Sequence, residues 1–273
     1  MPSSKTNNTI GVFDSGLGGL SVLKHFLKRL PQYDYLYLGD TARVPYGGHS
    51  QEVIYRYTQE AVDFLFAAGC QLIILACNTA SAQALRRLQQ EYLPKKYPNR
   101  RILGVIIPLA EYAARNSRIG VIGTRATINA KAYEREINKL NTKTEIFSQS
   151  APLLVPLIEE GLAGKDVTNK ILKNYLRPLK AKKIQTLILG CTHYPFLLKD
   201  IQRIMGKNCR IPDPGAIVAD SLENYLNRHP EFQNSHRHRG QCQFYLTDQP
   251  IHFLRLGEAF LGEKIKDPKI ISL

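Results

Sequence analysis

Two short segments of this 273-residue chain share one pattern. Residues 73–79, I-I-L-A-C-N-T, and residues 187–193, L-I-L-G-C-T-H, each place a cysteine after a buried strand and a small residue, ahead of two polar residues and a helix. The two cysteines, Cys77 and Cys191, lie 114 residues apart, about one domain length. The repeat therefore predicts two related α/β lobes, each offering a cysteine at the carboxyl end of a strand, where open α/β sheets bind their ligands.

Short apolar strands alternate with amphipathic helices along the chain, which is typical of an α/β protein with mainly parallel sheets. We expect buried strands at residues 9–13, 35–39, 72–76, 102–105, 119–122 and 186–190, and a returning strand at 241–246. Apolar residues at helical spacing predict helices at residues 17–30, 50–68, 80–92, 127–140, 167–180 and 195–205.

These patterns predict two pseudo-symmetric, doubly wound lobes with mainly parallel sheets and an active site in the cleft between them. We expect residues 1–101 together with 212–273 to form the first lobe, which carries Cys77, because the C-terminal strand returns to it. Residues 102–211 are expected to form the second lobe, which carries Cys191.

The five cysteines favour a reducing compartment over a disulfide framework. They contain no C-x-x-C pair, and their odd number leaves one unpaired in any full disulfide scheme, so a zinc site is also not expected. The N-terminus has no secretory signal. The longest apolar run, residues 102–110, is much shorter than the roughly 20 residues that cross a bilayer. We therefore expect a cytoplasmic protein with no membrane partner.

The formal net charge of +14 suits either nucleic acid or an acidic substrate. The basic residues are dispersed over separate segments, and no aromatic-interleaved basic stripe or helix-turn-helix pattern is present. A solvated surface with mild attraction for anions is therefore favoured, and no obligatory nucleic-acid partner is expected. Residues 234–240, which are basic and contain histidines, are interpreted as an exposed loop.

Each cysteine motif is a candidate for acid–base chemistry. A cysteine at the start of a helix lies near free backbone N–H groups and the positive end of the helix dipole, which lower a thiol pKa. His193 could share a proton with a thiol or with a substrate. A single such cysteine could equally be a packed thiol. Two in matching positions favour a pair that acts on one bound molecule.

A glycine-rich segment, D-S-G-L-G-G-L at residues 14–20, follows the first strand and begins a helix. It is not a dinucleotide loop, because Ser21 occupies the position of the last required glycine. The segment could be a tight turn, or its amides could approach an anion while Asp14 offers a carboxylate to an ammonium or a proton. A second turn-rich loop, G-D-T-A-R-V-P-Y-G-G, occupies residues 39–48.

These two segments, together with C-N-T-A at 77–80 and G-C-T-H-Y-P at 190–195, resemble the glutamate racemase family in order and spacing over nearly the whole chain. The resemblance implies Cys77 and Cys191 as the acid–base pair, with Asp14 and His193 assisting. It also implies Glu159 as a helper, for which the adjacent Glu160 is the alternative. It also implies no pyridoxal phosphate, metal or nucleotide. The implied substrate contacts are Asp14, Ser15, Pro45, Tyr46, Gly47, Asn78, Thr79, Thr192 and His193.

The chemistry of racemisation agrees with two cysteines. A proton leaves one face of the α-carbon and another returns to the opposite face, so two groups are needed. One must be thiolate and the other thiol, which makes them a coupled pair. The resemblance further implies glutamate as the small-molecule substrate, supply of D-glutamate for peptidoglycan synthesis, and a homodimer.

Three alternatives remain open from the sequence. An aspartate racemase of the same superfamily would have the same fold and a different pocket depth. A hydrolase or amidase that uses Cys191 with His193 would leave the first cysteine motif unexplained. A nucleic-acid-binding protein would explain the charge and would show steeply salt-dependent binding.

Overall fold

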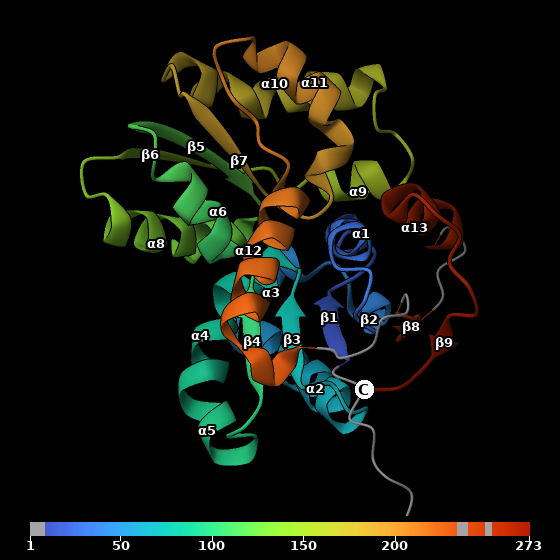
Figure 1. Cartoon of the computed structure of the whole chain (residues 1–273). Helices are drawn as coiled ribbons and strands as arrows, with labels where there is room; N and C mark the ends of the chain where they lie inside the picture. Colours follow the sequence, from blue (N-terminus) through green and yellow to red (C-terminus); the bar gives the residue numbers. More distant parts are fainter. Residues whose placement is uncertain (1–8, 234–239, 249–252) are drawn as a thin grey trace, which may run out of the picture.

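The computed structural model describes residues 9–233, 240–248 and 253–273, and its strands form two parallel sheets (Figure 1). The larger sheet has the order β4-β3-β1-β2-β8-β9 and the smaller one the order β6-β5-β7, and every strand pair is parallel. The strands are β1 (Ile10–Asp14), β2 (Tyr35–Gly39), β3 (Leu72–Leu75), β4 (Arg101–Gly104), β5 (Arg118–Gly123), β6 (Glu145–Ser150), β7 (Thr186–Gly190), β8 (Cys242–Leu246) and β9 (Lys269–Ile270).

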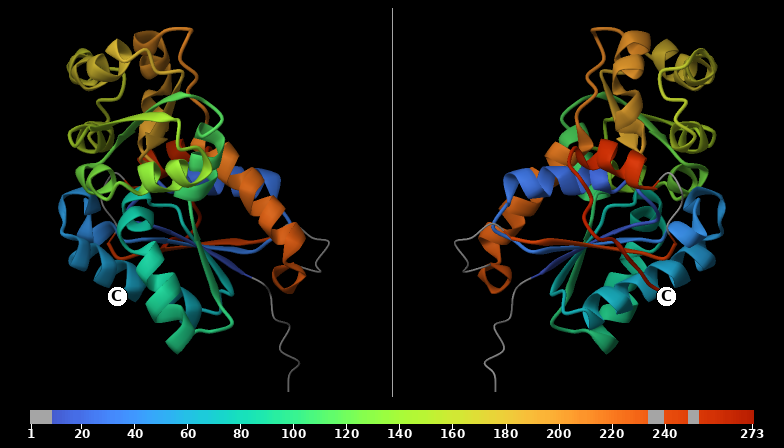
Figure 2. Two further views of the ribbon diagram at one scale, coloured as in Figure 1. Left: turned by 90° about the vertical axis from the view of Figure 1, so that its left-hand side faces the viewer. Right: turned by 90° about the vertical axis from the view of Figure 1, so that its right-hand side faces the viewer.

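Helices cover both faces of the larger sheet, which Figure 2 shows edge-on. The main helices of this part are α1 (Leu20–Arg29), α2 (Gln51–Ala67), α3 (Asn78–Gln83), α4 (Leu85–Arg87), α5 (Leu93–Lys96), α12 (Pro214–Arg228) and α13 (Phe253–Leu261). Those around the smaller sheet are α6 (Ile106–Ala113), α7 (Arg125–Asn129), α8 (Ala132–Leu140), α9 (Leu154–Glu159), α10 (Asp166–Ala181) and α11 (Leu198–Met205). Because both faces of the larger sheet are covered, β1, β2 and β3 are buried along their whole length, and β7 of the smaller sheet is buried as well.

The predicted α/β class with mainly parallel sheets is confirmed. The lobe boundary after residue 101 needs correction, because β4 pairs with β3, so residues 102–104 belong to the larger sheet. The returning strand is β8, which pairs with β2, and α12 packs on α1. The C-terminal segment therefore joins the sheet that precedes Cys77.

Some elements differ from those expected. The helix predicted at 80–92 is divided into α3, α4 and a π-helical turn, Leu88–Tyr92. The polar edge strand β6 was not predicted, because its exposed face removes the apolar signal. Residues 234–239 of the predicted exposed loop lie outside the described residues. No helix in the described part of the chain is long and apolar enough to span a membrane.

Candidate active site

A cavity of about 270 Å³ lies between the two cysteine motifs. Both Cys77, which follows β3, and Cys191, which follows β7, line it, so the repeat brings the two thiols to one site. The cavity is smaller than the roughly 300–1,000 Å³ of typical drug-binding pockets, so it suits a smaller molecule. The other sequence-predicted residues that line it are Ser15, Pro45, Tyr46, Gly47, Asn78, Thr79, Glu159, Thr192 and His193.

Cys77 is held at the start of α3. Its sulfur accepts a hydrogen bond from the backbone N–H of Ala80 at 3.5 Å and lies 3.4 Å from the hydroxyl of Ser15. Burial raises the pKa of Cys77 to about 12, and the charge of Asp14 adds to this, while the bonds with Ser15 and Ala80 act in the opposite direction. The helix N–H group of Ala80 lowers this pKa as expected, but desolvation outweighs it, so the expected net lowering is wrong for Cys77.

Cys191 begins a chain of three polar side chains. Its sulfur lies 3.9 Å from Nδ1 of His193, and Nε2 of the same ring lies 3.0 Å from Oε1 of Glu159. Burial favours neutral His193, but the contacts with Cys191 and Glu159 outweigh it and raise the pKa of His193 to about 10. Glu159, not the exposed Glu160, therefore meets the histidine, and His193 is a cation at neutral pH.

Asp14 lies behind the cavity wall rather than on it. It is fully buried at the end of β1 and does not line the cavity. Its carboxylate accepts hydrogen bonds from the N–H of Gly16 at 2.9 Å and from the hydroxyl of Thr192 at 3.2 Å. Burial raises the pKa of Asp14, although the charge of His193 opposes this. Asp14 thus joins the first motif to the second cysteine motif.

The glycines of the segment at 14–20 allow this close approach. A Cβ atom on Gly18 would lie under 3.0 Å from Thr192 Oγ1 and His193 Nδ1, and one on Gly19 would meet the side chain of Asp14. The segment is therefore a tight packing turn against the second cysteine motif, and the anion that its Gly16 amide approaches is Asp14 itself.

Polar contacts also join the first cysteine motif to the smaller sheet. The hydroxyl of Tyr133 donates to Oδ1 of Asn78 at 2.5 Å, which leaves the Asn78 amide N–H groups as donors. The hydroxyl of Thr79 lies 2.9 Å from that of Thr124 and 3.1 Å from that of Thr127. These contacts fix the position of the start of α3, which follows Cys77.

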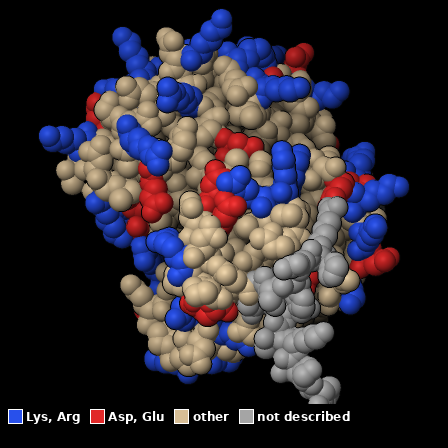
Figure 3. Space-filling view, viewed as in Figure 1, with Lys and Arg blue, Asp and Glu red and all other residues tan. Residues whose placement is uncertain are grey.

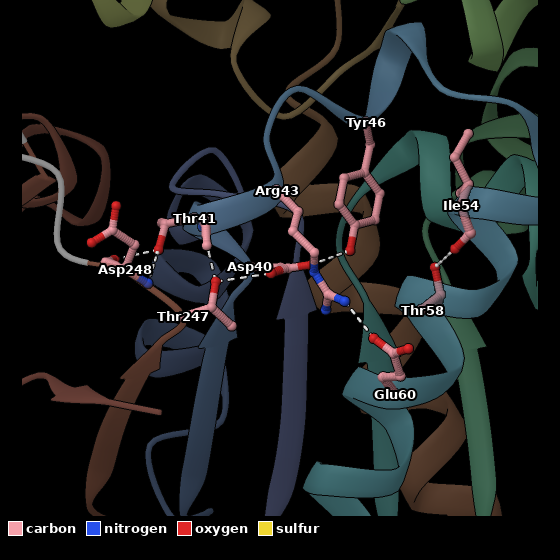
Figure 4. A network of polar contacts seen from close by, with 10 residues as sticks. Asp40, Thr41, Arg43, Tyr46, Ile54, Thr58, Glu60, Thr247 and Asp248 are labelled. Atoms are coloured by element: carbon pink, nitrogen blue, oxygen red, sulfur yellow. Dashed lines mark hydrogen bonds and ion pairs between the residues drawn. The ribbon is translucent and has the colours of Figure 1, made fainter. Parts of the chain in front are cut away.

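The loop before α2 is held by a buried carboxylate (Figure 4). Asp40 is fully buried and accepts hydrogen bonds from Nε of Arg43 at 2.7 Å, the hydroxyl of Thr247 at 2.8 Å and the hydroxyl of Tyr46. The Tyr46 hydroxyl thus points to Asp40, and burial followed by the charge of Asp40 raises its pKa. Tyr46 therefore positions Pro45 and Gly47, and its hydroxyl is engaged within the protein.

Several cavity residues were not predicted. Val44, Gly48, Thr124, Arg125, Pro152, Leu153, Val155 and Pro156 also line the cavity. Arg125 is the single Lys or Arg among the described lining residues, and its side chain is exposed. A signal for it exists in the sequence, because Thr124 and Arg125 follow a buried strand and begin a helix, as the two cysteine motifs do.

The site therefore offers two thiols, a histidine–carboxylate pair and a set of hydrogen-bond donors around a small cavity. Such donors suit the carboxylates of a small acid. Among the described residues, no group of three His, Cys, Asp or Glu side chains is arranged to hold a metal ion.

Comparison with known proteins gives the same family throughout. Residues 10–222 match the family model Asp/Glu/Hydantoin racemase. The chain is 41% identical over 268 residues to glutamate racemase of Geobacter metallireducens, covering 97% of this chain and 96% of that protein. It is also 41% identical to glutamate racemase of Aquifex aeolicus, covering 96% and 97%.

Solved structures agree. Glutamate racemase from Francisella tularensis in complex with D-glutamate superposes with a TM-score of 0.90 at 36% identity, covering 98% of each chain. An aspartate racemase of Picrophilus torridus, 13% identical with a TM-score of 0.56, shares the fold.

Proposed function

Since the chain belongs to the Asp/Glu/Hydantoin racemase family, as one of its glutamate racemases, we propose that Cys77 and Cys191 interconvert L- and D-glutamate as an acid–base pair. The observation that carries this proposal is the shared cavity, which both cysteines line from the ends of strands in different sheets. A substrate between them would present its two faces to different thiols.

Each turnover moves two protons. One cysteine, as thiolate, removes the α-hydrogen from one face and becomes a thiol. The other, as thiol, donates its proton to the opposite face and becomes the thiolate. The electron pair of the broken C–H bond forms the new one, so no oxidant or reductant is needed. The raised pKa of Cys77 supports its role as the donating thiol in one direction of the reaction, since it is protonated at neutral pH, and the roles of the two cysteines reverse in the other direction.

His193 and Glu159 support the second half of the pair. Cationic His193 lies beside Cys191, and its bond to Glu159 holds the ring in position. The imidazolium can stabilise negative charge on the Cys191 sulfur and near the α-carbon. Asp14 acts through Thr192, which it orients, because it does not reach the cavity surface.

Hydrogen-bond donors around the cavity would hold the substrate. Ser15, Asn78 and Thr79 offer neutral donors, and Arg125 offers a charged one, while the Thr192 hydroxyl donates its proton to Asp14. The apolar side chains of Val155 and Pro156 suit the methylene groups of glutamate. The D-glutamate complex of the Francisella relative and the 41% identity to glutamate racemases support glutamate as the substrate.

The wider proposal follows from the product. D-glutamate would supply peptidoglycan synthesis, in the cytoplasm, where the free cysteines stay reduced.

We expect a homodimer, which light scattering of the purified protein would test. Activity should survive dialysis against a chelator and need no added pyridoxal phosphate. Faster racemisation of aspartate than of glutamate would favour the alternative substrate.

The deciding experiment follows the hydrogen in heavy water. With two thiols, the donated hydron comes from solvent, so early product should carry deuterium at nearly every α-carbon while remaining substrate carries very little. Cys77→Ala and Cys191→Ala should each lose racemisation by several orders of magnitude, because one thiol reaches one face. Serine at either position should be nearly as damaging. Early product that keeps protium, or a racemising Cys77→Ala enzyme, would rule out the two-thiol mechanism.

A further inference from the structure

A groove lies between α10 and α11, outside the cysteine cavity. Its volume is about 570 Å³, and its described lining residues are Lys173, Asn174, Arg177, Lys180, Ala181, Arg203 and Ile204. Four of these are basic and none is acidic, so the groove gathers positive charge in a concave surface. Figure 3 shows Lys and Arg side chains over the top of the molecule, where Figure 1 places these two helices.

Charge is concentrated in this part of the chain. Residues 165–210 contain eleven of the 37 Lys and Arg residues and two of the 23 Asp and Glu residues. One of these two acids, Asp200, pairs with Arg203 at 2.6 Å. Among the ion pairs between described residues, none involves Lys173 or Arg177, and both side chains are exposed. This segment therefore has a net charge of +9, and four of its cations line the groove.

The helix geometry aligns these cations. Lys170, Lys173, Arg177 and Lys180 follow the spacing of one face of α10, over about 15 Å at a rise of about 1.5 Å per residue. Arg203 faces them from α11. Like charges at such spacing repel one another, so the row favours a bound polyanion that neutralises it.

We propose that this groove binds the phosphate backbone of a nucleic-acid duplex without reading its sequence. A row of cations along a groove matches a regularly charged backbone, which supplies most of the affinity in non-specific binding. The groove lacks aromatic residues among its described lining, so a stacking platform for single strands is not present there. This interaction is separate from racemisation, because no groove residue lines the cysteine cavity.

An anionic membrane fits the helices less well. Interfacial helices insert an apolar face beside their cations. The buried residues of α10, Thr168, Leu172, Leu176 and Leu179, are already packed inside the protein. Of the exposed large hydrophobic residues among the described ones, only Val167 belongs to α10, and it lies at the helix start, outside the groove.

The test compares two variants of equal charge. Lys173→Gln with Arg177→Gln removes two groove cations, and Lys28→Gln with Lys95→Gln removes two exposed cations from the larger lobe. Fluorescence anisotropy with a 30-base-pair DNA duplex measures affinity from 50 to 200 mM salt. If all four lining cations meet phosphates, wild-type affinity should fall about 150-fold over this range, and that of the groove variant about 12-fold. The affinity of the control variant should fall with salt concentration as steeply as that of the wild type.

Three results would overturn the proposal. The control variant could lose as much affinity as the groove variant, or the wild type could fail to bind the duplex at 50 mM salt. Groove-dependent binding to vesicles with anionic phospholipid, without binding to the duplex, would assign the surface to a membrane. Both variants should racemise glutamate like the wild type, which shows that they are folded.

Discussion

The charges of a few single residues decide how this site binds an acidic substrate. Arg125 brings one guanidinium to the cavity. This guanidinium takes part in none of the ion pairs between described residues. Glu159, which also lines the cavity, is already paired with His193. Apart from His193, Arg125 is therefore the one cationic side chain that a substrate with two carboxylates meets among the described lining residues.

Arg125→Gln should raise KM for glutamate about fivefold and change kcat less than twofold. Loss of one partly exposed charge contact costs about 1 kcal/mol, and uniform loss of binding appears in KM alone. Initial rates for both enantiomers measure this. Lys143→Gln, which removes an exposed cation of the same lobe outside the cavity, is the control and should leave KM unchanged. Equal KM values for the two variants would show that Arg125 does not contact substrate.

The contacts of His193 with Cys191 and Glu159 should make stability depend on pH. Because the folded pKa of His193 is about 10, above its ordinary 6.5, its contribution is complete below pH 6.5 and is lost as pH rises through 10. The free energy of unfolding should fall by about 2 kcal/mol more in the wild type than in His193→Gln over this range. Urea unfolding at pH 6, 8 and 10 measures the difference.

The exposed His229–Glu231 pair supplies the control for that experiment. The unfolding free energy of His229→Gln should vary with pH as that of the wild type does. If the unfolding free energy of His193→Gln varied with pH in parallel with that of the wild type, the raised pKa of His193 would be contradicted.

At the scale of elements, glycine turns set how closely the segments approach. The turn before α1 packs against the residues that follow β7, and Gly47 packs against Thr124 before α7. Two strand-to-helix turns of the larger sheet thus contact two turns of the smaller one. The cavity lies where these turns meet.

Gly18→Ala should destabilise the protein by about 1–3 kcal/mol and reduce racemisation strongly, because its Cβ would overlap Thr192 and His193. Gly48→Ala is the matched change, since a Cβ there meets no atom within 4 Å, and its unfolding free energy should match the wild type. Urea unfolding compares the two. A Gly18→Ala protein as stable as Gly48→Ala would mean that the turns can separate at little cost.

At the scale of the whole molecule, the cavity joins two sheets with separate strand orders. One hydrophobic cluster contains residues of both, such as Leu20 and Tyr37 beside Ile119 and Leu189. The core is therefore continuous across the sheets, so we expect them to unfold together.

Glutamate should stabilise the whole fold, because it would contact residues from both sheets. A ligand at 100 times its Kd adds about 2.7 kcal/mol to the free energy of unfolding. Thermal or urea unfolding with D-glutamate, against sodium chloride of equal ionic strength, measures this. The expected result is one transition that shifts as a unit. Two transitions, of which only one responds, would show that the sheets unfold independently.

The sequence alone determined the parts of this protein that depend on neighbouring residues. Apolar runs marked the buried strands, and the repeated strand–cysteine pattern marked the two motifs that line the cavity. These signals are local, because a few consecutive residues are enough to indicate a buried parallel strand or the start of a helix.

Only the tertiary structure decided which groups meet. It placed Asp14 behind Thr192, turned the Tyr46 hydroxyl to Asp40 and brought Arg125 to the cavity from a third strand-to-helix turn. It also raised the pKa of Cys77, whose helix start alone predicted the reverse. The physical reason is that desolvation and hydrogen bonding depend on residues distant in sequence, and only packing of the two sheets brings those residues together.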